Sequence, residues 1–418
     1  MMILGGWKAF RQKMRQMCSG KYLLAVIWAF CMLYQPPLPV SIIYILTAAS
    51  FAYMFAFARR KLQRYVVLAL PFLFMFLLLL LVSVLNGTPM AEISHFFWLM
   101  VGILPAALAF SSMSVRSGEY LMSVLTTAAT LQALLALGAL VSPSFQSMLH
   151  GMMQRYGLYS GKHIATWGYR IYGYGASLMF AIPVVQSVIA AWLMLRGILR
   201  RKVLPMVLCA LIMFTAMINA KVCLFTFAAA LGVGMVLVRK LIAKRLLFIT
   251  VVGTVVLMAL LYAAQMLLSD NSRLSDWLSI LQDEDRVARF YVSYYTDLEK
   301  YRLPDGLSLI WGTGQPRPDA DVDMGFINDV WIGGLVYSAF TMWMVLRWVR
   351  LIRENAVGGE LWSRVMGYSL LAAYLVANVK GTAFSYSSFM AFFMLVAMFG
   401  YGERRLIRRR SGWRRGRQ

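Results

Sequence analysis

The sequence predicts an all-α polytopic membrane protein with about twelve transmembrane helices, and its composition and segment lengths are the two observations behind this prediction. Of the 418 residues, 61% are hydrophobic and 14% are charged, and the mean hydropathy is +0.67. A soluble chain of this size could not cover its surface with so few polar groups, so lipid must solvate much of it. Apolar runs of about twenty residues recur along the chain, and each can cross a hydrocarbon core of ~30 Å as a helix.

The apolar runs are expected to form one integral membrane domain over residues 1–418. The first run follows a basic segment and ends at Gln35-Pro36-Pro37 rather than at a small-residue cleavage site. This ending favours a membrane anchor over the alternative of a cleaved signal peptide. The expected spans are residues 22–34, 38–58, 65–85, 95–113, 120–142, 174–195, 203–219, 221–238, 246–268, 325–346, 364–380 and 383–402.

Positive charge predicts how these spans are oriented. With the N-terminus inside, the seven predicted cytoplasmic segments hold 30 of the 41 Lys and Arg residues, and each of the seven contains at least one. Because Lys and Arg accumulate in cytoplasmic loops, we expect both termini in the cytoplasm, with a basic tail at 403–418. The same rule accounts for the net charge of +24, which in a soluble chain would indicate nucleic acid as a partner. We therefore expect no nucleic-acid binding.

Two outer loops stand out by their length. Residues 143–173 and 269–324 are longer than most connections in a helical bundle, and long loops are often functional. The second loop holds 11 of the 17 Asp and Glu residues. Apolar residues recur in it at helical spacing from Leu274 to Leu298, which predicts that this larger loop is partly helical and lies against the membrane surface.

Cations on the outer side are the first candidate site residues. Arg offers a planar fork that can grip two phosphate oxygens, and a cation at a membrane boundary is costly unless it is solvated or paired. Several such groups around an outer cavity would suit a lipid-linked pyrophosphate. The alternative is that each side chain extends to water or to ordinary headgroups. The residues chosen for pyrophosphate binding are Arg170, Lys221, Arg286 and Arg289.

Carboxylates and a histidine are the second group. Asp323 belongs to an acidic cluster before the tenth span, for which a solvated acidic edge is the alternative. Asp329 falls about one turn inside that span, so we expect it to pair with another group or to line a cavity. His163 could act as a general base, although a single loop histidine often has no such role. Tyr294 and Asp329 are chosen as substrate-binding residues.

The sequence contains no recognisable cofactor or metal motif. HExxH, P-loop and GxSxG patterns are absent, and Gly312-Thr313-Gly314 alone does not indicate a nucleotide site. The four cysteines lie in or beside apolar segments without the spacing of metal ligands or of a disulfide framework. We therefore expect no metal site and no cofactor.

Three short patches, in order along this layout, suggest a family. The first is Arg170-Ile-Tyr-Gly173 before the sixth span, and the second is Asn219-Ala-Lys221 before an apolar span. The third combines Arg289, Ile310-Trp-Gly312-Thr-Gly314, Asp323 and Gly334. Patches and topology together resemble the bacterial O-antigen polymerase and O-antigen ligase superfamily, which has Arg where this chain has Lys221.

The third patch separates the two branches of that superfamily. Ligases have His-Asn, then nine residues, Gly, two residues, and Gly, Thr or Tyr. Here Gly334-Leu-Val-Tyr337 fits the end of the motif, but Asp323-Met324 occupies the His-Asn position. The missing His favours the polymerase branch.

The resemblance implies a metal-independent glycosyltransferase in the bacterial inner membrane, with polyprenyl-pyrophosphate-linked oligosaccharides as substrates at the periplasmic face. The four cations above would stabilise the leaving pyrophosphate, and Asp323, or else His163, would take the acceptor proton. Membrane lipids and a separate chain-length regulator are the other expected partners. The alternatives are an O-antigen ligase that acts on lipid A core, a lipid-linked oligosaccharide flippase or transporter, and a peptidoglycan-type polymerase.

Overall fold

The computed structural model describes residues 19–88, 93–113, 118–156, 180–243, 301–317, 324–354, 359–381 and 387–401. Within these ranges the chain is helical and contains no strand, as predicted. Six of the helices are long and apolar enough to cross a membrane. They span Arg59–Asn86, Ser94–Ser111, Gly118–Val141, Ala181–Arg200, Val222–Leu241 and Gly325–Glu354. The predicted span at 246–268 and the basic tail at 403–418 lie outside the described residues.

Shorter apolar helices accompany the six long ones, at Gly20–Tyr34, Ile42–Phe57, Val203–Asn219 and Ser388–Phe399. The described helices are α2 (Gly20–Tyr34), α3 (Ile42–Phe57), α4 (Arg59–Asn86), α5 (Ile93–Trp98), the π-helical segment η1 (Leu99–Ile103), α6 (Leu104–Met113), α7 (Gly118–Val141), α8 (Pro143–Arg155), α10 (Ala181–Arg200), α11 (Val203–Asn219), α12 (Val222–Ile242), α16 (Ser308–Trp311), α17 (Gly325–Glu354), α18 (Glu360–Lys380) and α19 (Ser387–Tyr401).

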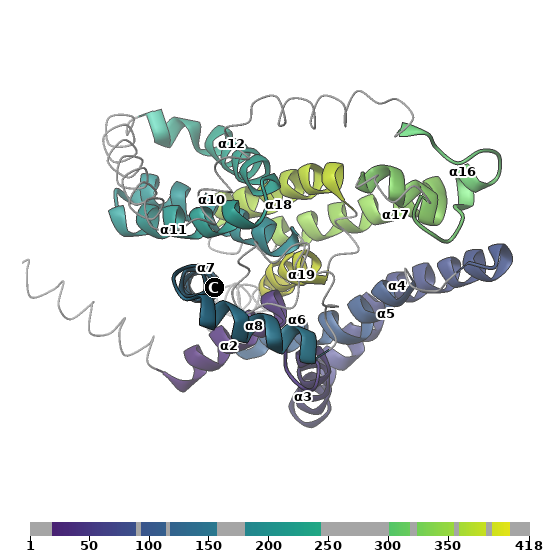
Figure 1. Ribbon diagram of the computed structural model, residues 1–418, viewed down its shortest axis with the longest axis horizontal. Helices are drawn as coiled ribbons and strands as arrows, with labels where there is room; N and C mark the ends of the chain where they lie inside the picture. Colours follow the sequence, from purple (N-terminus) through teal and green to yellow (C-terminus); the bar gives the residue numbers. More distant parts are fainter. Residues whose placement is uncertain are drawn as a thin grey trace, which may run out of the picture.

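The centre of the bundle is α19. Its side chains from Phe389 to Phe399 are all buried, and it contacts α2, α6, α10 and α17. Figure 1 shows α19 between two groups of helices, with α10, α12, α17 and α18 above it and α2, α3 and α6 below. The C-terminal helix therefore joins the N-terminal helices to the later ones.

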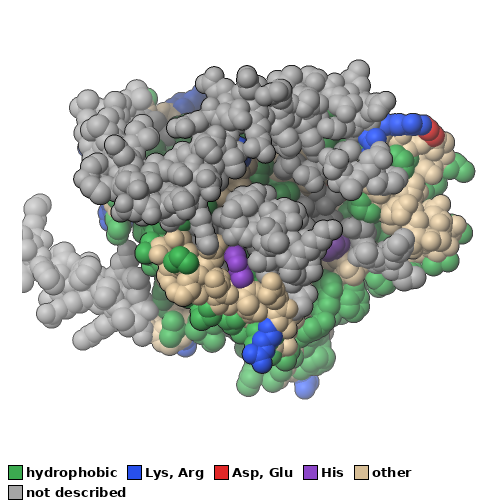
Figure 2. Space-filling view, in the orientation of Figure 1, with side chains coloured by type: hydrophobic (Ala, Val, Ile, Leu, Met, Phe, Trp, Pro, Cys, Tyr) green, Lys and Arg blue, Asp and Glu red, His purple; other side chains and the backbone are tan. Residues whose placement is uncertain are grey.

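The outer helices expose large apolar side chains. Val67, Leu70 and Phe74 of α4 are 59%, 54% and 58% exposed. Figure 2 shows hydrophobic side chains covering the lower part of the molecule, over α3 and α4. A surface of this kind is costly in water and is suited to lipid contact.

In the described part of the chain, hydrogen bonds and a shared pocket bring parts of four predicted basic segments together at one end of the bundle, called the basic end here. Arg196 and Arg200 of α10 donate to the Glu119 carboxylate at the start of α7. Lys61 at the start of α4 donates to the carbonyl oxygen of Leu108, and its Nζ lies 2.9 Å from that oxygen. Near the same start of α4, the side chains of residues 60 and 64 share a pocket with those of residues 347 and 351 of α17.

Several boundaries differ from the predicted ones. Helix α4 begins at Arg59 rather than at 65, and α17 continues to Glu354 rather than ending at 346. Arg, Lys and Leu are good helix formers, so both helices extend beyond their apolar stretches. The first part of the 143–173 loop is the helix α8, in which the Ser142 hydroxyl accepts a hydrogen bond from the Phe145 N–H.

Candidate functional site

The candidate site is built around a break in α17, at the end of the bundle opposite the basic end. Gly333 and Gly334 have non-helical backbone angles, and Gly334 has φ 69° and ψ −169°. A break in a membrane helix frees carbonyl groups that need donors, because no water is present in the hydrocarbon core. Broken helices are tolerated at membrane depth where protein or a water-filled cavity surrounds them.

The segment Gly312-Thr313-Gly314, called the Gly-Thr-Gly turn here, supplies the missing donors. The Thr313 N–H lies 2.7 Å from the carbonyl oxygen of Trp331, and the Gly314 N–H lies 3.0 Å from that of Ile332. The Thr313 hydroxyl also donates to the Trp331 carbonyl, over 2.9 Å. The loop before α17 thus completes the backbone hydrogen bonding of α17 itself.

Glycine is required where the loop and the helix break meet. Gly312 has φ 79°, and a Cβ atom there would overlap the backbone of Gly333. A Cβ atom on Gly334 would overlap the carbonyl group of Ile310. Only glycine adopts these angles at no cost and lets two backbones approach so closely. The segment from Gly312 to Gly314 therefore packs into α17.

Two further contacts fasten this loop to the first half of α17. The Trp331 indole Nε1 donates to the carbonyl oxygen of Arg302 over 3.1 Å. The Asn328 side-chain oxygen accepts from the Arg317 N–H over 3.3 Å. Residues 301–317 and the helix break therefore form one unit, and this end of the bundle is called the loop end here.

A buried carboxylate lies one turn before the break. The Asn378 side-chain amide of α18 donates to Asp329 Oδ2 over 2.9 Å, and the two residues are 0% and 1% exposed. The prediction that Asp329 would pair with another group is thereby confirmed. Gly325, at the start of α17, packs against the backbone of Asn378 and Gly381, so the start of α17 lies close to the end of α18.

Lys221 lies at the same end as this pair. It is half-buried at the N-cap of α12, in the break that follows Asn219. Helices α12 and α18 pack together, and the Ser369 hydroxyl donates to the Ala230 carbonyl oxygen over 3.0 Å. Helix α18 begins after the end of α17 at the basic end, whereas α12 begins after α11 has run away from that end, so α12 and α18 are antiparallel. Lys221 precedes Ala230 by nine residues and Asn378 follows Ser369 by nine, so Lys221 and Asn378 lie at a similar depth.

Of the predicted site residues, the structure describes Lys221 and Asp329. The others, Asp323, His163, Arg170, Arg286, Arg289 and Tyr294, lie outside the described residues. Sequence reasoning missed Asn378, the amide partner of Asp329. Its signal is a polar amide near the end of an otherwise apolar run. It also missed the helix break, although the adjacent pair Gly333-Gly334 within a predicted span is a signal for one.

A scan against protein-family models finds no matching family, and a search of curated proteins finds no match to this chain.

Proposed function

We propose that this protein is an O-antigen polymerase of the bacterial inner membrane, with its active site on the periplasmic side, at the loop end. The single observation that carries the proposal is the broken α17, whose gap is filled by the Gly-Thr-Gly turn beside the buried Asp329–Asn378 pair. Discontinuous membrane helices commonly form binding sites. Here the break brings the Gly-Thr-Gly segment and the buried polar pair together at the loop end. The motif residues of the resemblance, Ile310 to Gly314 and Gly334, are the residues that build this feature.

The proposed reaction joins two lipid-linked glycans. A sugar hydroxyl of the incoming unit attacks the anomeric carbon of the growing glycan, the new glycosidic bond forms, and the bond to the pyrophosphate oxygen breaks. Asp323, or else His163, accepts the hydroxyl proton. Polyprenyl pyrophosphate leaves as an anion, which Arg170, Lys221, Arg286 and Arg289 stabilise. Tyr294 contacts the sugars. Asp329, predicted as a second substrate-binding residue, is too buried for such a contact and instead supports the helix break through Asn378.

Apolar side chains around the loop end support a lipid-linked substrate. Leu307 is 76% exposed, and Ile310 and Trp311 of α16 are 43% and 47% exposed. Exposed apolar groups next to a polar site suit a substrate that has a polyprenyl tail and a charged head. The basic end would then face the cytoplasm, with both termini there and the chain-length regulator as a separate partner.

Two other functions share parts of this feature. An O-antigen ligase uses the same kind of lipid-linked glycan as its donor substrate, but Asp323 occupies the position where ligases have His. A flippase or transporter also uses broken helices. The spans of this chain carry few charges at mid-depth, which favours chemistry at the outer surface over passage through the bundle.

A silver-stained lipopolysaccharide gel of a strain without the gene tests the proposal. We expect the ladder to collapse to core plus a single repeat unit, and the intact gene to restore it. Arg289→Ala and Asp329→Asn should fail to restore the ladder. Arg302→Ala is the matched control, because Arg302 is exposed at the loop end and its side chain pairs with Asp305.

The other outcomes separate the alternatives. Complete loss of O-antigen from the core would favour a ligase or a flippase, since neither leaves a single attached unit. An unchanged ladder would overturn the O-antigen proposal.

A further inference from the structure

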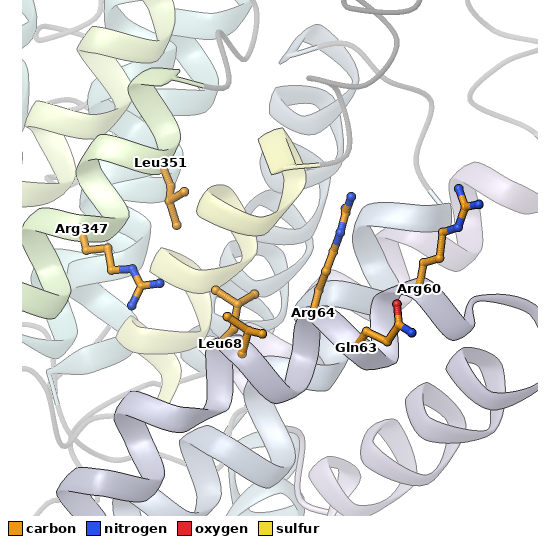
Figure 3. Close-up of a pocket in the computed structure, with 7 residues that line it drawn as sticks. Arg60, Gln63, Arg64, Leu68, Arg347 and Leu351 are labelled. Atoms are coloured by element: carbon orange, nitrogen blue, oxygen red, sulfur yellow. The ribbon is translucent and has the colours of Figure 1, made fainter.

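At the basic end, a pocket lies between the start of α4 and the end of α17. Its volume is about 470 Å³, and it is far from the helix break. The lining is strongly cationic and includes no acidic residue among the described residues that form it. It consists of Arg60, Gln63, Arg64, Val67, Leu68, Arg347 and Leu351. Figure 3 shows Arg60, Gln63 and Arg64 on one stretch of α4 and Arg347 on the neighbouring α17.

The geometry of the pocket suits a phosphate group. Arg60 and Arg64 are one helical turn apart on α4, and Arg347 comes from a second helix, so the pocket is lined by guanidinium groups from two helices, the groups that phosphate oxygens prefer. The Arg347 guanidinium also lies 5.3 Å from the centre of the Trp343 ring, which fixes its direction. Gln63 adds a neutral donor.

The surface that leads away from the pocket is apolar on both helices. On α4, Val67, Leu70 and Phe74 follow the basic turn at helical spacing and are all more than half exposed. On α17, Trp343 is 47% exposed, one turn from Arg347. The rings of Phe74 and Phe340 lie 6.1 Å apart between centres, so the two apolar stripes converge. An acyl chain can pack against these apolar stripes, whereas a free phosphate cannot.

We propose that this pocket binds the phosphate headgroup of an anionic membrane phospholipid, with an acyl chain lying along the exposed side chains of α4 and α17. The basic end carries most of the cationic segments, and basic pockets between membrane helices recognise anionic headgroups on the cytoplasmic side. The bound lipid bridges the start of α4 and the end of α17. This site is separate from the proposed glycan site and does not depend on its chemistry.

The test uses full-length protein purified in a neutral detergent. Its thermal unfolding is measured with added phosphatidylglycerol, phosphatidylcholine or inorganic phosphate, and native mass spectrometry counts the phospholipids that remain bound. We expect phosphatidylglycerol alone to raise Tm and to stay bound. The double variant Arg60→Gln/Arg347→Gln should bind it more weakly by about tenfold or more.

Arg350→Gln is the matched control, because Arg350 lies on the same end of α17 but is exposed and pairs with Glu354. It should bind phosphatidylglycerol like the unaltered protein. If the double variant does not fold, Arg60→Gln alone serves, since Arg60 is exposed. Equal stabilisation by phosphatidylcholine or by inorganic phosphate would overturn the lipid assignment. Equal loss of binding in Arg350→Gln would overturn the pocket as the site.

Discussion

At the scale of single residues, the buried pair of Asp329 and Asn378 has a direct energetic consequence. A carboxylate in an apolar span is costly unless donors surround it, and the Asn378 amide is one such donor. The sequence alone could predict that Asp329 needs a partner, from its depth in the span. It could not identify Asn378, because that residue is 49 positions away and reaches Asp329 only through the packing of α17 on α18.

Substitution of the Asp329–Asn378 pair is expected to change the stability of the protein. Asn378→Leu should lower the free energy of unfolding by about 2–3 kcal/mol, because it removes a donor from a buried carboxylate. The double variant Asn378→Leu/Asp329→Leu should recover most of this loss, since both polar partners are then replaced by apolar groups. Thermal unfolding of the purified variants in detergent measures both. A double variant that is as unstable as the sum of the two single ones would contradict the coupling.

At the scale of elements, the break in α17 shows which parts of a fold a sequence can reveal. Adjacent glycines at 333 and 334 indicate a weak point in a span, and the glycines at 312 and 314 indicate a turn. Neither pattern indicates that the turn packs into the break, because that contact is tertiary.

Helix α8 is a different case, because a local sequence signal for it exists. Its local start signal, Ser142 followed by Pro143, indicates a helix, although the length of the 143–173 connection favours a loop.

Substitution at the break tests the fit of the turn. Gly334→Ala should destabilise the protein by about 3 kcal/mol or more, because its backbone angles are nearly exclusive to glycine and the added methyl group would meet Ile310. Gly232→Ala in α12 is the control, since a Cβ atom there meets no neighbour within 4 Å. That control should be neutral or slightly stabilising. Unfolding temperatures in detergent report the difference, and equal values for the two variants would argue against a tight contact between loop and helix.

At the scale of the whole molecule, the charge pattern of the sequence predicts more about the arrangement of the helices than the apolar pattern does. The pattern of Lys and Arg predicts which helix ends share a side, and the contacts of Lys61, Glu119 and Arg347 join several of those ends in space. Apolar runs alone define the lengths of helices but not how they pack. The central place of α19 could not be predicted in this way, because its apolar composition resembles that of the lipid-facing helices. Its burial follows from the helices around it.

The orientation of the molecule in the membrane gives the broadest prediction. In a protein whose four cysteines are replaced by alanine, a single Leu307→Cys should react with a membrane-impermeant maleimide in intact cells, because Leu307 is exposed at the loop end. Lys202→Cys, at the exposed end of α10 beside the Arg200–Glu119 ion pair, should react only after the membrane is permeabilised. The described cysteines, Cys31, Cys209 and Cys223, are small and lie partly or fully buried in apolar helices, so alanine should disturb their packing little. The opposite labelling pattern would mean that the basic end faces outward, against the bias that Lys and Arg impose on membrane insertion.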